Sequence, residues 1–152
     1  MEFGWKRHLV NLDFNVVDFD QAESGDIWAV AQRQRRGGTT SAILRLGRGE
    51  WMSVVALDSR LEAISAHRDN SIVAVGDSSV HFDGDGWVMR ELDVPCSKVW
   101  GAHASCVYAL SGKTLFHFNG HEWVHIDLAA AGIPGEWADG EMVTVIRPAL
   151  PG

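Results

Sequence analysis

Histidine is the residue of this sequence best suited to chemistry, because the imidazole ring is both a general base near neutral pH and a metal ligand. The chain has seven histidines, and His81 and His117 stand 36 residues apart at the same place of a repeated phrase. That spacing would suit ligands on neighbouring units. Arg45 occupies the same place in the first unit, and arginine is not a ligand. We therefore interpret the two histidines as strand residues that point to solvent, and we expect no metal site.

Two other motifs resemble chemical sites. The phrase Asp83-Gly-Asp-Gly86 is similar to the start of a calcium loop, but the glutamate at the twelfth position is missing. Gly112-Lys-Thr114 contains part of a phosphate-binding motif, yet it bridges two predicted strands, whereas a P-loop ends in a helix N-terminus. We interpret both as turns. Because the nucleophile motif GxSxG is also absent, we expect no enzyme activity and no cofactor.

Composition limits the classes of partner. The formal net charge of −7 argues against nucleic acid and against an anionic membrane surface. The same charge suits a basic protein partner, or it serves solubility alone. No run of 18 apolar residues occurs, and the first ten residues lack the apolar core of a signal peptide, so we expect a cytoplasmic protein. Cys96 and Cys106 lack CxxC spacing and are expected to be free thiols.

An internal repeat supplies the elements that position these residues. Trp51, Trp87 and Trp123 follow one another at intervals of 36 residues. Each ends a phrase in which a hydrophobic residue lies five places earlier, with a glycine-rich turn between them. Asp83-Gly84 and Asn119-Gly120 are strong hairpin dipeptides, because both tolerate the positive φ that such turns require. The repeat therefore predicts a β-hairpin closed by each tryptophan.

Each unit predicts four short antiparallel strands in about 36 residues, which is the size of a β-propeller blade. The sequence predicts one all-β domain over residues 1–152, a small propeller with blades at about 13–57, 58–93 and 94–128. An insertion at 32–40 lengthens the first unit. A composite fourth blade would join residues 1–12, which place Trp5 in register, to residues 129–152, where Trp137 aligns with Trp100. An open half-ring that pairs with a second copy and a flattened β-sandwich are the alternatives.

A family resemblance supports the propeller. The phrase from Lys98-Val-Trp-Gly101 through Cys106-Val-Tyr-Ala-Leu110 and Asn119-Gly120 to Trp123 resembles one blade of bacterial propeller-repeat proteins, and tectonin-like propellers are similar. The resemblance covers residues 98–123 well, 70–92 moderately and 26–57 loosely. It implies a scaffold and not an activity.

Segments that break the repeat are candidates for partner binding. The first is acidic, with Phe14 and Phe19 between its charges, and its alternative is a solvated connecting strand. Its acids are Asp13, Asp18, Asp20, Glu23 and Asp26. The second is the insertion, whose alternative is a mobile surface loop. Its cations are Arg33, Arg35 and Arg36. The third is a C-terminal patch of Glu136, Trp137, Asp139 and Glu141.

These observations predict a non-enzymatic protein-binding module, either monomer or homodimer. Its most concrete form is a cytoplasmic immunity protein that neutralises a basic toxin, possibly a nuclease, by occluding it. A glycan-binding or small-ligand-binding propeller is the alternative, with Trp5, Trp51, Trp87 and Trp123 as stacking platforms. An enzyme with an unrecognised site is the third hypothesis.

Overall fold

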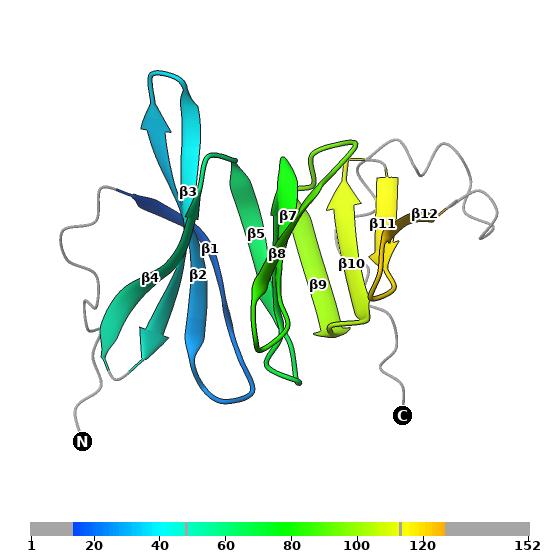
Figure 1. The fold of residues 1–152 in the computed structure, drawn as a ribbon, viewed down its shortest axis with the longest axis horizontal. Helices are drawn as coiled ribbons and strands as arrows, with labels where there is room; N and C mark the ends of the chain where they lie inside the picture. Colours follow the sequence, from blue (N-terminus) through cyan, green and yellow to red (C-terminus); the bar gives the residue numbers. More distant parts are fainter. Residues whose placement is uncertain (1–13, 48, 113, 127–152) are drawn as a thin grey trace.

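The computed structural model describes residues 14–47, 49–112 and 114–126 (Figure 1). Every regular element in these ranges is a β-strand, and the strands form three antiparallel sheets of four. The first sheet contains β1 (Asn15–Gln21), β2 (Ile27–Arg35), β3 (Gly38–Gly47) and β4 (Glu50–Leu57). The middle sheet contains β5 (Leu61–Ala66), β6 (Ile72–Gly76), β7 (Ser78–Phe82) and β8 (Trp87–Glu91). The third sheet contains β9 (Lys98–His103), β10 (Cys106–Ser111), β11 (Thr114–Phe118) and β12 (Trp123–Ile126).

The predicted four-stranded units are confirmed, and the tryptophan repeat is the hairpin between the third and fourth strands of each sheet. Each tryptophan pairs with the hydrophobic residue five places before it. The three pairs are Leu46 with Trp51, Phe82 with Trp87 and Phe118 with Trp123. Residues 1–12 and 129–152, assigned above to a composite blade, lie outside the described residues. The number of blades and the closure of the ring therefore stay predictions.

Side chains hold the two predicted Gly-containing turns closed. The Asp83 carboxylate accepts the main-chain N–H groups of Asp85 and Gly86 at 2.9 and 3.0 Å. The Asn119 side-chain oxygen accepts the N–H groups of residues 121 and 122 at the same two distances. Asp83 is thus a turn residue, and the N–H groups of Asp85 and Gly86 lower the pKa of its carboxyl.

The three sheets lie face against face in chain order (Figure 1). Val30 and Ile43 of the first sheet pack against Ile64 and Ile72 of the middle sheet, and all four are buried. The opposite face of the middle sheet packs through Val73 on Val107 and Phe118 of the third sheet. Because period-two alternation sends successive residues to opposite faces, the middle sheet buries both. This explains its nearly continuous apolar strand β6.

The closing tryptophans of the middle and third sheets pack on the sheet before them. The ring of Trp87 lies 6.0 Å from that of Trp28 in the first sheet. The ring of Trp123 lies 5.8 Å from that of His81 in the middle sheet, and its indole N–H donates to the Ser79 hydroxyl at 3.0 Å. These indoles therefore contribute to the contact between sheets.

The first strands of the sheets are joined by hydrogen bonds from main chain to side chain. The N–H groups of Ile64 and Ala66 on β5 donate to the carboxylates of Asp18 and Asp20 on β1, at 2.9 and 2.8 Å. The N–H of Gly101 on β9 donates to the Ser65 hydroxyl on β5 at 3.1 Å. The bonded residues are 46 and 36 positions apart, which is close to the lengths of the first and second repeat units. Equivalent positions of neighbouring sheets are thus bonded directly.

Gly101 has no side chain because a buried histidine occupies that space. A Cβ atom at Gly101 would lie 2.4 Å from Nε2 of His67, a ring that is 1% exposed. The Nδ1 atom of His67 lies 2.7 Å from the Ser71 hydroxyl, which in turn donates to the Asp69 carboxylate. The other Asp69 oxygen accepts the N–H of Ala104 at 3.1 Å. The turn between β5 and β6, which contains Asp69, is therefore also bonded to the third sheet.

Cys96 and Cys106 are free thiols, and burial raises the pKa of Cys96 to about 11, so this thiol is protonated at neutral pH. Within the described part of the chain, no helix has the length and apolar character needed to cross a bilayer.

Substitution of Gly101 by alanine tests the contact between the middle and third sheets. The added methyl group overlaps the His67 ring, and such overpacking costs about 1–3 kcal/mol of unfolding free energy. Urea denaturation measures the loss. Gly86→Ala, where a Cβ meets nothing within 4 Å, is the matched control and should cost much less. In a His67→Ala background the Gly101→Ala cost should shrink; an equal cost in both backgrounds would contradict the contact.

Candidate functional site

The β2–β3 hairpin is longer than its equivalents and projects beyond its sheet. β2 and β3 have nine and ten residues, whereas β6 and β7 have five each. Pairing with β1 ends at Gln32, and pairing with β4 ends at Ser41. Residues 33–35 and 38–40 therefore pair only with each other among the described strands. Figure 1 shows this ribbon extending past the ends of β5 and β7.

The base of the hairpin is fixed to the middle sheet. The Gln32 side-chain amide donates to the carbonyl of Leu61 at 2.7 Å, and the Leu61 N–H donates to the Ser41 hydroxyl at 2.8 Å. Ser41 and Leu61 are completely buried. The N–H and the C=O of Leu61 are thus both bonded to side chains of the first sheet, so the base of the hairpin is fixed to the middle sheet.

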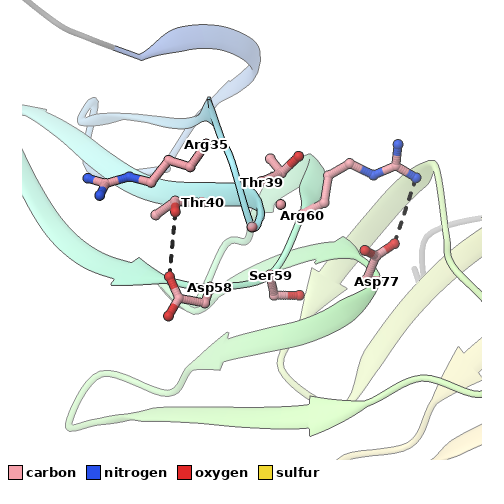
Figure 2. A pocket seen from close by; sticks show the side chains of 9 residues that line it. Arg35, Thr39, Thr40, Asp58, Ser59, Arg60 and Asp77 are labelled. Carbon is pink, nitrogen blue, oxygen red and sulfur yellow. Dashed lines mark hydrogen bonds and ion pairs between the residues drawn. The ribbon is translucent and has the colours of Figure 1, made fainter.

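A cleft of about 670 Å³ opens between the hairpin and the middle sheet. That volume lies within the roughly 300–1,000 Å³ usual for ligand sites. Figure 2 shows its lining side chains, which come from the hairpin, from the loop between β4 and β5, and from the turn after β6. The lining residues are Arg35, Gly37, Gly38, Thr39, Thr40, Asp58, Ser59, Arg60 and Asp77.

Main-chain contacts hold the floor of the cleft. The Asp77 N–H donates to the Arg60 carbonyl at 2.8 Å. The residue before Asp77 must be glycine for this close approach, because a Cβ atom at Gly76 would lie 2.0 Å from the Arg60 carbonyl oxygen. The Ser59 and Ser78 hydroxyls are 2.5 Å apart beside it. The residues below the hairpin therefore form an ordered polar surface.

The two arginines of the cleft have different surroundings. Arg60 forms ion pairs with Glu62 and Asp77 at 3.3 and 3.7 Å. Arg35 is exposed and has no ion pair among the described residues. The two guanidinium groups extend toward opposite ends of the cleft, with Thr39 and Ser59 between them (Figure 2). Such an arrangement suits an extended ligand with spaced polar groups better than one small anion held by two converging arginines.

In the predicted acidic segment, the acidic residues that the structure describes do not line the cleft. Asp18 and Asp20 bond the main chain of β5, as described above, so both carboxylates serve the fold. Asp26 pairs with Arg45, whose Nε atom donates to it at 2.9 Å. Glu23 is exposed. Asp13 lies outside the described residues, and a partner-binding role for the acidic segment stays a prediction.

The predicted basic residues divide between the base and the tip of the hairpin. The Arg33 guanidinium lies over the Phe14 ring at 4.8 Å from its centroid. Arg35 lines the cleft, and Arg36 is exposed in the turn. The C-terminal patch of Glu136, Trp137, Asp139 and Glu141 lies outside the described residues.

The expectation that His81 points to solvent is wrong. The ring is 8% exposed and lies 4.4 Å from the Phe118 ring of the third sheet, centroid to centroid. Alternation fails as a guide here because the middle sheet has a neighbour on both faces. His117, at the equivalent place of the third sheet, is half-buried and packs on Tyr108 at 4.7 Å. The described residues contain no group of three or more potential metal ligands close enough to share an ion.

Sequence reasoning missed most of the cleft. Asp58, Ser59, Arg60 and Asp77 were not singled out, because they lie in ordinary turns of the repeat. Only the stacking of the middle sheet on the first brings them beneath the hairpin. The signal that could have found them is the insertion itself, because the extra residues must overhang the loops next to their base.

Comparisons with known proteins give a structural likeness but no family. No family model matches the sequence, and no curated protein matches it. Among solved structures, a catalytically inactive variant of virginiamycin B lyase from Staphylococcus aureus, crystallised with quinupristin, is similar at 11% identity and a TM-score of 0.48. The match covers 78% of this chain and 57% of that chain, so this chain spans little more than half of the lyase. The lyase activity is a property of that protein.

The buried histidines predict a pH dependence of stability. Burial lowers the pKa of His67 to about 4, and burial together with the Arg90 charge lowers that of His81 to about 3. The unfolded chain takes up these protons near pH 6.5, whereas the folded chain does not. The unfolding free energy is therefore unaffected by these histidines above that pH and falls as the pH drops toward 4. The expected slope is roughly 1.4 kcal/mol per pH unit for each histidine.

Urea denaturation between pH 7 and 4.5 measures this slope. His81→Gln should remove about half of it, and His121→Gln in an exposed turn is the control. A slope that His81→Gln leaves unchanged would show that other groups cause the acid sensitivity.

Proposed function

We propose that this chain is a non-enzymatic protein-binding module built on a small β-propeller, with the β2–β3 hairpin and its cleft as the binding element. One observation carries the proposal: a ribbon longer than its equivalents rises from a fixed base beside a polar cleft. It presents exposed Arg36 and also Arg35, which has no ion pair with any residue that the structure describes. An ordered base reduces the entropy lost when a projecting element binds a partner. Arginine is also enriched among the residues that contribute most to interfaces.

The most concrete form of this function is an immunity protein that occludes a basic toxin domain. Support comes from the net charge of −7, since opposite fields accelerate encounter with a basic partner. The electrostatic field of the whole chain acts at long range, whereas Arg35 and Arg36 at the tip of the hairpin act only on contact. The field brings the partner close, and the hairpin contacts an acidic group on it.

We include in the proposal a fourth, composite blade that closes the ring. Support comes from the side of the first sheet that faces away from the middle sheet. Ala29, Ala31 and Ala42 on that side are at most 1% exposed. Trp51 has a buried indole N–H with no acceptor among the residues that the structure describes, whereas its equivalent Trp123 donates to Ser79 of the neighbouring sheet. A further sheet packed there would supply an acceptor in the same way.

The two indoles that pack on a neighbouring sheet, Trp87 and Trp123, contribute contact area there and have less ring surface left for stacking on sugars. We therefore favour protein binding over the glycan-binding alternative.

A pair of matched charge reversals tests the binding element. A photo-crosslinking amino acid at position 36 should capture a protein in cells of the source, and the same residue at exposed position 121 should not. With the captured protein purified, Arg36→Glu should weaken the dissociation constant at least tenfold. Arg68→Glu changes the net charge equally at an exposed site on the middle sheet and should change it less than threefold.

Equal effects of the two reversals would contradict the hairpin as binding element and leave only the overall field. A captured partner that is not basic, or that is harmless to cells lacking this chain, would contradict the immunity form.

A further inference from the structure

The free edge of β3 lies along the cleft. β4 pairs with β3 from Ser41 onward and then turns away after Leu57, so no described strand accompanies residues 38–40 on that side. The hairpin is closed by two residues, and in such a hairpin the flanking pair exchanges both hydrogen bonds. That pair is Arg35 and Gly38. Thr39, the next residue, therefore directs its main-chain N–H and C=O away from β2 and toward the cleft.

An unpaired strand edge beside a cleft is a site for β-strand addition. In this mode an extended segment of a partner bonds the main chain of the edge strand, and side-chain contacts give specificity. An extended occupant also agrees with the two arginines of the cleft, which reach toward opposite ends and do not converge on one point (Figure 2). The polar residues between them, Thr39 and Ser59, line the path.

The charges indicate which segment fits. Arg35 and Gly38 are cross-strand partners, so their Cα positions share one face of the ribbon. Gly38 has no side chain, and a Cβ atom built there meets nothing within 4 Å. A residue of the occupant opposite Gly38 would thus face Arg35 across open space. Within the part of the chain that the structure describes, Arg60 has two carboxylate partners and Arg35 has none, so Arg35 is the cation of the cleft left for an acidic group.

We propose that the cleft binds an extended, acidic segment of the partner protein, which adds to the β3 edge at Thr39 and places a carboxylate on Arg35. This inference rests on the proposed protein-binding function and names the chemistry of its partner. Thr39 would supply one N–H and one C=O to the segment, and Arg35 would supply the charge-assisted hydrogen bond.

Two substitutions of Thr39 separate main-chain pairing from side-chain contact. Thr39→Val removes the hydroxyl and keeps the N–H, whereas Thr39→Pro removes the N–H that the added strand needs. A phage-displayed library of linear ten-residue peptides is the probe, selected on the full-length chain. Selected peptides should share an acidic residue at a fixed position. Their affinity, measured by fluorescence polarisation, should change less than threefold in Thr39→Val and fall at least tenfold in Thr39→Pro and Arg35→Glu.

A second measurement does not depend on whether Thr39→Pro folds. Amide hydrogen exchange of the unmodified chain should show rapid exchange at Thr39, slowed at least tenfold by a saturating selected peptide. No selected peptides, equal binding by Thr39→Val and folded Thr39→Pro, or no added protection at Thr39 would each overturn the inference. If the partner captured through position 36 binds folded Thr39→Pro and Thr39→Val equally, strand addition is wrong and the proposed function stands. If position 36 captures nothing, the proposed function fails as well.

Discussion

The arrangement of this molecule depends on side-chain oxygens that bond the main chain of the next sheet. The first strand of each sheet is an edge, and an uncovered edge invites pairing with another chain. Asp18 and Asp20 satisfy two N–H groups of β5, and Ser65 satisfies one of β9. Hydrogen bonds to a charged group contribute about 1.5–3 kcal/mol each. These bonds cap the edges and also fix how far one sheet is turned against the next.

Once the sheets are fixed in this way, the cleft follows from one departure in the repeat. The extra residues of the first unit pair with each other and with no further described strand, so they continue as a two-stranded ribbon above loops of the middle sheet. Their base is tied to Leu61, and their tip remains available. The scaffold and the proposed binding element are therefore separate parts of the same sheet. Changes at the tip can alter binding without disturbing the stacking.

Much of this fold could be predicted from the sequence, because its signals are local. A tryptophan five residues after a hydrophobic residue, with Asp-Gly or Asn-Gly between them, specifies a hairpin by turn chemistry alone. The position of the insertion was also visible, since it interrupts an otherwise regular spacing.

What could not be predicted depends on which sheet faces which. His81 looked like a solvent-facing strand residue, but the third sheet covers that face. Asp18 and Asp20 looked like a docking surface, because nothing in their sequence reveals the N–H groups of β5, 46 residues away. The cleft combines Arg35 with Arg60 and Asp77, which only stacking brings together.

Hydrogen exchange at Ala66 tests the central claim most directly. The account holds that the Asp20 carboxylate bonds this amide across two sheets, so the Ala66 N–H should be protected in the unmodified chain. Asp20→Ala should accelerate its exchange at least tenfold, leave Ile64 protected through Asp18, and differ from Glu23→Ala, which removes an exposed acid of the same segment. An Ala66 amide that exchanges equally fast in all three proteins would contradict the stacking on which the rest of the structure depends.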